Sequence, residues 1–286
     1  MNLTIKTTSL RAQAEGLLLN GSENIVYNVS IGGSGDALQS NGSAYYAGCS
    51  IDGSGDIILG RGPSFFKDCE FRSSGGTYMW IRNDSTNHGN VFVNCKFMTA
   101  GGREIELARA PTNGGKNYPY CEAVLLNCKL AGISPLGWGP IGGDASNIHY
   151  WEYNNTNISD GKPVNINQRH PASRQLTIEN DSDIISNYSK PAYVLEDWTP
   201  NMAPIILSQP QSVIVPKGRE VSFNVEVAAI PEASYQWYIN GQAKTGATNA
   251  VLTIKTVSTI DAGKYSVTIK NHLGRVISHE ATLTVK

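Results

Sequence analysis

The chain of 286 residues carries little charge and has no long apolar run. Charged residues make up only 16% of it and the formal net charge is −1, so bulk charge gives no reason to expect a nucleic acid or an anionic membrane surface as a partner. No apolar stretch approaches the ~20 residues of a membrane span. The N-terminus also lacks the continuous apolar segment of a signal peptide.

The spacings that bind metals are missing as well. The cysteines number five, an odd count without a C-x-x-C pair, and none of the five histidines has H-x-x-x-H spacing. We therefore expect no zinc site. The alternative role for the thiols is that of small, buried apolar groups. The cysteines are Cys49, Cys69, Cys95, Cys121 and Cys128.

Glycine, asparagine and serine are frequent, which predicts an all-β fold with many turns. A four-residue unit recurs along the first 160 residues: a small polar residue, a stacking residue, a polar residue and a large apolar one. Its second members are 20 to 33 residues apart, and four of the five cysteines share that position. The copies begin at Asn2, Asn28, Gly48, Asp68, Asn94, Asn127 and Asn155.

A repeat of this length with insertions of variable size is typical of a solenoid. Alternation within each unit predicts a strand whose second and fourth residues face inward. The copies are not separated by amphipathic helices of roughly 10–15 residues, which disfavours a doubly wound α/β sheet. We therefore expect parallel β-coils, with like residues aligned in columns from one coil to the next.

A second domain is expected after the proline-containing stretch Trp198–Pro204. Short strands recur there, and Trp237 has the place of a sandwich-core tryptophan. The segment Asp261–Tyr265 resembles the D-x-G-x-Y corner of immunoglobulin domains, and Val225 and Val267 match the two disulfide positions of that family. The predicted domains are a parallel β-helix over 1–203 and an immunoglobulin-like β-sandwich over 204–286.

Two aspartates have the same place in successive copies of the repeat. Asp36 lies seven residues after Val29, and Asp56 lies seven after Cys49. Since adjacent coils are ~4.8 Å apart, both carboxylates are expected to point into one groove. Close carboxylates repel, so one tends to hold a proton and act as an acid while the other serves as nucleophile or base. The alternative is that each Gly-Ser-Gly-Asp segment is only a turn, repeated because the coils repeat.

Segments of residues 2–198 resemble, in order, motifs of the pectin methylesterases, carbohydrate esterases built on a right-handed parallel β-helix. The most specific match is IDGSGDIILG at Ile51–Gly60, which resembles the family's I-E-G-T-V-D-F-I-F-G. The other matches are NLTIK at Asn2–Lys6, QA with a later leucine at Gln13–Leu17, DAL at Asp36–Leu38, LAR at Leu107–Arg109, PLGW at Pro135–Trp138 and EYNN at Glu152–Asn155.

The resemblance implies hydrolysis of the methyl esters of polygalacturonate, without a metal or another cofactor. Asp56 would attack the ester carbonyl, and Asp36 would protonate the departing methanol and then activate water. Arg109 would keep Asp56 ionised and oriented, and Gln13 would donate a hydrogen bond to the oxyanion. Trp138 would form a wall on which a sugar stacks.

The chain departs from the family at several points. Gly35 stands where the family has a glutamine before the acid aspartate, which removes an oxyanion donor. Ala110-Pro111-Thr112 follows Arg109 where a tryptophan is expected, and Trp80 is the candidate for a replacement wall. Two other hypotheses follow: a non-catalytic pectin-binding or adhesion protein, and a different polysaccharide-active enzyme, such as a calcium-dependent lyase, on the same scaffold.

The family usually has further coils before the segment that Asn2–Lys6 resembles. We therefore expect that N-terminal coils are missing from this chain or that another chain covers that end. The family acts on plant cell-wall polymer in pectin degradation and wall modification, which predicts a secreted or cell-surface protein. The expected partner is pectin or polygalacturonate, and the immunoglobulin-like domain is expected to contact carbohydrate or another module.

Overall fold

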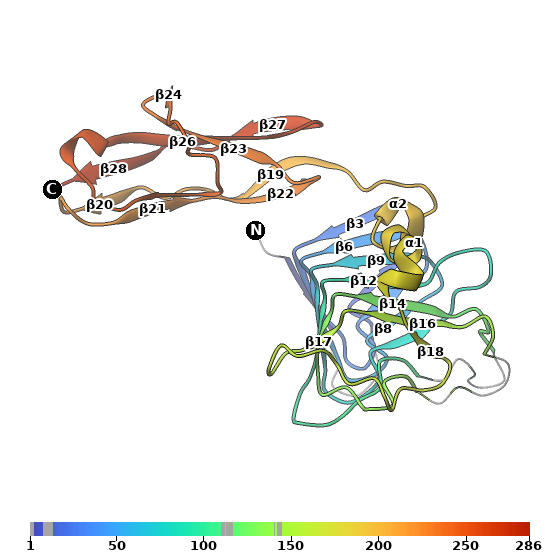
Figure 1. Cartoon of the computed structure of the whole chain (residues 1–286). Helices are drawn as coiled ribbons and strands as arrows, with labels where there is room; N and C mark the ends of the chain where they lie inside the picture. Colours follow the sequence, from blue (N-terminus) through green and yellow to red (C-terminus); the bar gives the residue numbers. More distant parts are fainter. Residues whose placement is uncertain (1–2, 8–13, 110–111, 113–116, 140, 142–144) are drawn as a thin grey trace. The chain divides into compact units, whose positions relative to one another are not determined.

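The computed structural model describes residues 3–7, 14–109, 112, 117–139, 141 and 145–286 (Figure 1). They form two compact units, one ending at Pro200 and the other running from Asn201 to Lys286. The division lies within the Trp198–Pro204 segment. None of the helices in the described ranges is long and apolar enough to cross a membrane.

Three parallel sheets build the first unit as a β-helix, which confirms the predicted architecture (Figure 1). Each strand pairs with the equivalent strands of the coils before and after it. The first sheet contains β1 (Leu3–Lys6), β4 (Val29–Gly32), β7 (Ser50–Gly53), β10 (Glu70–Ser73), β13 (Lys96–Thr99), β15 (Lys129–Ala131) and β17 (Thr156–Asn157). The second contains β2 (Leu17–Leu19), β5 (Leu38–Ser40), β8 (Ile58–Gly60) and β11 (Met79–Ile81). The third contains β3 (Asn24–Tyr27), β6 (Ala44–Ala47), β9 (Ser64–Lys67), β12 (Asn90–Val93), β14 (Glu122–Leu126), β16 (His149–Tyr153) and β18 (Ser173–Gln175).

Like residues form columns inside the stacked coils. The Phe66 ring stacks between Tyr46 and Phe92, with ring centroids 4.5 and 4.8 Å away. Burying each such side chain stabilises the unit by roughly 1.5–3 kcal/mol. A second column consists of buried free thiols, as predicted from their shared register; its members are Cys49, Cys69, Cys95 and Cys128.

The small polar residue that opens each repeat unit has a left-handed backbone. The φ angle is 57° at Asn28, 62° at Gly48 and 55° at Asp68. Asparagine, aspartate and glycine adopt this conformation at the lowest cost. The turn into the first sheet therefore explains why this position of the repeat is restricted to them.

The last copy of the repeat is predicted one residue too late. The left-handed residue is Asn154, with φ of 50°, so Asn155 takes the place that Cys128 has in the coil before. The buried Asn155 accepts a hydrogen bond at Oδ1 from the Cys128 backbone N–H at 2.9 Å. A one-residue slip reverses the two faces of a strand, and Ile158, predicted to face inward, is exposed. The two consecutive asparagines make the register ambiguous in the sequence.

We expect none of the five thiols to react with Ellman's reagent in the folded protein. Burial raises the pKa of the Cys121 thiol to about 11 and that of Cys69 well above its ordinary value, so the reactive thiolate is scarce. The assay should detect about zero thiols in buffer and all five after unfolding in urea. A thiol that titrates rapidly in buffer would contradict this burial.

Two helices follow the last strand of the β-helix. The helix α1 (Ile178–Tyr188) is capped by Thr177, whose side chain accepts a hydrogen bond from the Asn180 N–H, and it has acidic residues in its first turn. The short α2 (Pro191–Val194) follows it. At the end of α1, the Tyr188 hydroxyl donates to Glu122 of β14 at 2.6 Å, which fixes the helix against the outer side of the third sheet.

The second unit is built mainly from antiparallel strands around one core. Trp237 is fully buried, and the Tyr265 hydroxyl donates to the Asp261 carbonyl at 2.7 Å, as the resemblance to immunoglobulin domains implied. Val225 and Val267 are buried in this core. The elements are β19 (Met202–Ser208), β20 (Val213–Val215), β21 (Val221–Asn224), β22 (Glu226–Ile230), β23 (Ser234–Ile239), β24 (Gln242–Ala243), β25 (Val251–Ile254), η1 (Thr259–Asp261), β26 (Gly263–Asn271), β27 (Gly274–Ile277) and β28 (Ala281–Val285).

Candidate functional site

Asp36 and Asp56 lie side by side on adjacent coils. Asp36 is in the turn between β4 and β5, and Asp56 is in the turn between β7 and β8. Strand pairing places them at equivalent positions, and Asp36 Oδ1 accepts a hydrogen bond from the Asp56 backbone N–H at 3.1 Å. The structure thus brings together the two carboxylates that their spacing predicted.

Glycines allow the two turns to pack so closely. Gly35 has φ of 100°, a conformation that a side chain would strain. A Cβ at Gly55 would lie 2.7 Å from Asp36 Oδ1, which is closer than atoms tolerate. The two Gly-Ser-Gly-Asp segments therefore form turns. These turns also bring the two carboxylates together, so the segments are not turns alone.

The Asp56 carboxylate is held at both oxygens. Arg109 Nη1 donates to Oδ2 at 2.6 Å, and the Thr77 hydroxyl donates to Oδ1 at 2.7 Å. The side chain of Asp56 is 13% exposed, so water competes weakly with these donors. A cation and a hydroxyl that donate to the two oxygens of a carboxylate fix its orientation.

Thr77 was not recognised from the sequence, although a signal for it exists. Strand pairing places Asp36, Asp56 and Thr77 at equivalent positions of three successive coils. The third coil is one residue longer in this interval, which moves Thr77 out of the 20-residue period. Counting back from the strand β11, rather than forward from the cysteine, would have found it.

Arginines gather beside the aspartates. The guanidinium carbons of Arg82 and Arg109 lie 4.9 and 4.8 Å from the centroid of the Trp80 ring. Burial and then the neighbouring Arg61 lower the pKa of Arg82, while Tyr118 and both aspartates act in the opposite direction. Within the described part of the chain, Arg82 Nε and Nη2 and Trp80 Nε1 are buried without a hydrogen-bond partner.

Trp80, the candidate for a replacement wall, contacts Arg109, which in turn binds Asp56. The guanidinium groups of Arg82 and Arg109 lie over the Trp80 ring. The ring also packs edge to face against Tyr118, with 5.9 Å between centroids. Cation–π contacts of this kind hold an arginine in place as well as a ring. Trp80 is thus linked to Arg109, the partner of Asp56.

The prediction that Trp138 forms a sugar-stacking wall is wrong. Trp138 is fully buried, its ring stacks on Tyr150 at 4.5 Å, and its Nε1 donates to Glu152 Oε1 at 3.1 Å. A ring with both faces packed in the core has no surface for a sugar. The motif that contains Trp138 gives the order of residues along the chain but not the direction in which the side chain points.

Gln13, the predicted oxyanion donor, lies outside the described residues. The neighbouring Ala14 is described: its N–H donates to the Ser34 carbonyl at 2.9 Å, and the Ser34 N–H donates back at 3.1 Å. Ser34 belongs to the turn that carries Asp36. Within the described ranges, no group of three or more His, Cys, Asp or Glu side chains is placed to hold a metal ion.

Known proteins resemble the chain in parts. A peroxidasin homolog of Caenorhabditis briggsae is 27% identical over 147 residues, which are 49% of this chain and 11% of that protein. Among solved structures, titin M4 is 32% identical, with 31% of this chain and 100% of that chain covered and a TM-score of 0.28. The tandem Ig repeats of Dlar are 22% identical, with 29% and 48% covered and a TM-score of 0.28.

Two family models match successive parts of the sequence. The immunoglobulin domain model matches residues 203–271, which lie in the second unit. The pectinesterase model matches residues 1–177, more than half of the 286 residues, and this range includes both aspartates and Arg109. The chain, through its β-helix, therefore belongs to the pectinesterase family.

Proposed function

We propose that the β-helix hydrolyses the methyl esters of polygalacturonate, with Asp56 as nucleophile and Asp36 as acid and base. The main support is the geometry of Asp56, which lies beside a second carboxylate and is held by Arg109 at 2.6 Å. Membership of the pectinesterase family supports the same reaction class. The cell wall is the proposed setting, with the protein secreted or at the cell surface.

The proposed reaction has two steps. In the first, Asp56 attacks the ester carbonyl, the C–O bond to methanol breaks, and Asp36 gives its proton to the departing methoxide. This leaves an anhydride between Asp56 and the galacturonate. In the second, Asp36 takes a proton from water, hydroxide attacks the anhydride, and Asp56 leaves as a carboxylate. The oxyanion needs a hydrogen-bond donor in both steps, and Gln13 remains the proposed donor.

The direct test is methanol release from highly methylated pectin by the full chain. Release would support the esterase. A folded protein that binds pectin without releasing methanol would favour the second candidate, a non-catalytic pectin-binding module. Two observations favour that candidate: Gly35 takes the place of a glutamine donor, and Trp138 is buried.

Replacing Arg109 with lysine should lower kcat by about 100-fold with little change in KM. Lysine keeps the positive charge, but it has no planar group to lie over Trp80 and to reach Asp56 at the same time. Initial rates of methanol release measure both constants. Arg103→Lys, an exposed arginine of the same unit, is the matched control, and equal rates for the two variants would contradict the role of Arg109.

Replacing Arg82 with glutamine should raise KM for substrates that carry free carboxylates and should change it little for substrates that carry none. Arg61, Arg82 and Arg109 place positive charge beside the reacting ester, so a neighbouring free galacturonate is attracted. We expect KM to rise roughly 5- to 10-fold for half-methylated pectin and to change little for fully methylated oligomers. Arg72→Gln, an exposed arginine on the first sheet paired with Asp52, is the control. Equal effects on both substrates would contradict this charge readout.

A further inference from the structure

A cavity of about 660 Å³ lies on the outer side of the third sheet, away from the two aspartates. Its walls come from the segment after β11, from β14 and β16, and from α1 and the residues around α2. All of these belong to the first unit. We call it the aromatic–acidic cavity, because aromatic and acidic side chains line it; those used below are Asp84, Tyr120, Trp151, Tyr193, Glu196 and Asp197.

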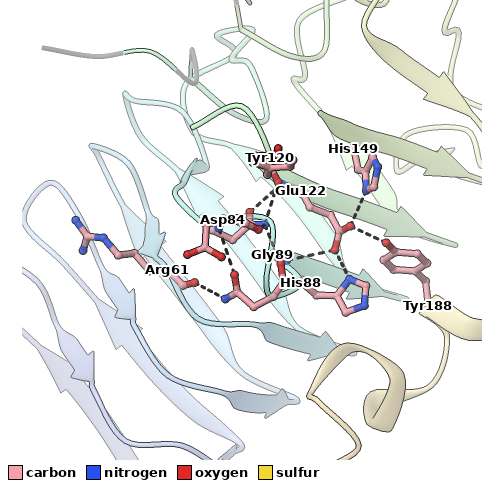
Figure 2. Close-up of polar contacts among 10 residues, drawn as sticks. Arg61, Asp84, His88, Gly89, Tyr120, Glu122, His149 and Tyr188 are labelled. Atoms are coloured by element: carbon pink, nitrogen blue, oxygen red, sulfur yellow. Dashed lines mark hydrogen bonds and ion pairs between the residues drawn. The ribbon is translucent and has the colours of Figure 1, made fainter. Parts of the chain in front are cut away.

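Glu122 organises the inner wall of this cavity (Figure 2). Its Oε1 lies 2.8 Å from His88 Nδ1 and accepts from the Gly89 N–H at 3.2 Å. Its Oε2 lies 2.7 Å from His149 Nδ1 and accepts from the Tyr188 hydroxyl at 2.6 Å. Burial raises the pKa of Glu122, but the hydrogen bonds from His149, His88 and Tyr188 outweigh it and lower that pKa to about 2.

The ionised Glu122 determines which ring nitrogen of each histidine carries the hydrogen. An ionised carboxylate only accepts hydrogen bonds, so both Nδ1 atoms carry a hydrogen and donate it to Glu122. In the neutral ring, Nε2 is then the free acceptor. The rings are held in place: His149 stacks on Trp151 at 4.1 Å between centroids, and His88 packs against Tyr193 at 4.9 Å. Both histidines line the cavity and keep part of their surface exposed.

The charges around the cavity have one sign. Asp84, Glu196 and Asp197 are exposed carboxylates, and the described lining contains no lysine or arginine. Arg61 contributes only its backbone carbonyl, which accepts from Asn87 at 2.6 Å, and its guanidinium points away from Glu122 (Figure 2). Such a cavity repels the carboxylates of polygalacturonate and attracts a cation.

Aromatic rings add a second contribution that favours a cation. Tyr120 and Tyr193 line the cavity and are 40% and 42% exposed, and Trp151 lines it from β16. The face of an aromatic ring attracts an ammonium group. The histidine Nε2 atoms accept hydrogen bonds from N–H or O–H donors. Carboxylates, ring faces and imidazole acceptors together match an ammonium group on a small polar molecule.

We propose that the aromatic–acidic cavity binds a small ligand that carries an ammonium group, such as an amine or an amino sugar, independently of the ester site. The preference for a cation comes from Asp84, Glu196 and Asp197 with the tyrosine rings. The two histidines, oriented by Glu122, supply the directional hydrogen bonds. A network that only attached α1 to the third sheet would not explain why both histidines also line a cavity that contains exposed carboxylates.

Isothermal titration calorimetry of the full chain with glucosamine tests this proposal. N-acetylglucosamine is the matched probe, because it keeps the ring and loses the charge. We expect glucosamine to bind at least about 10-fold more tightly, because only the ammonium gains from the carboxylates and rings. The double variant Glu196→Gln with Asp197→Asn should weaken glucosamine binding at least about fivefold.

Two control variants separate this cavity from other effects. Glu104→Gln with Asp160→Asn removes two exposed carboxylates that do not line the cavity, and it should leave the affinity unchanged. Asp56→Asn should also bind glucosamine as the parent does. Three results would each overturn the proposal. They are equal affinity for the two sugars, no binding of glucosamine at concentrations of ~10 mM and above, and an unchanged affinity in the Glu196 and Asp197 variant.

Discussion

Replacing Asp56 with asparagine is expected to lower the rate of methanol release from methylated pectin by at least about 10⁴-fold. Asparagine has nearly the shape of aspartate, and its carbonyl oxygen still accepts from Thr77, so the turn is preserved. It has no charge for Arg109 to stabilise and is a poor nucleophile, so the acyl-enzyme cannot form. Stopped-time assays of methanol, with saturating pectin, measure the loss in kcat.

Asp52→Asn is the matched control for that experiment. Asp52 lies on β7, four residues before Asp56, and forms a surface ion pair with Arg72 at 3.9 Å. Removing this charge should change the rate by no more than about twofold, since exposed pairs contribute little. An Asp56→Asn protein that binds pectin and keeps the rate of the parent would disprove the assignment of the nucleophile. An inactive parent would instead point to the binding module.

The sequence was sufficient to predict that the two aspartates lie side by side, because residues one repeat apart occupy equivalent positions on adjacent coils of a β-helix. Val29 and Cys49 stack in one column, so residues seven positions later also become neighbours. The contact of Arg109 with Asp56 was implied by the family resemblance, because insertions of different length separate the later coils and spacing alone does not predict it. The sandwich corner at Tyr265 was likewise implied by resemblance.

Other features depend on packing that the order of residues does not reveal. Trp138 was predicted in the groove, yet its Nε1 has a buried acceptor in Glu152, which stabilises the ring inside the coil. The Glu122 network was missed because His88 and His149 have no metal-ligand spacing and come from coils with unequal insertions. A glutamate at the start of a short apolar strand gives no sign of its burial, since its partners are distant in sequence.

Glu122→Gln should lower the free energy of unfolding of the first unit by about 3 kcal/mol at pH 7. The carboxyl has a pKa of about 2 in the fold against an ordinary value of 4.5, so folding favours its ionised form. Glutamine loses the charge and turns an N–H₂ group toward His88, His149 or Tyr188, which are donors. Calorimetry should show a lower Tm for this unit, by roughly 6–12 °C.

The pH dependence distinguishes this effect from a simple packing defect. Because the folded pKa of Glu122 is depressed, its contribution is complete above about pH 4.5 and is lost as the pH falls towards 2. The difference in free energy of unfolding between the parent and Glu122→Gln should therefore shrink as the pH falls from about 4.5 towards 2. Urea unfolding at pH 7, 4.5 and about 2.5 measures this difference. Glu70→Gln, which breaks a surface pair with Lys96, should cost less than about 1 kcal/mol throughout. A gap for Glu122→Gln that stays constant down to about pH 2.5 would mean that shape, and not charge, links the third sheet to α1.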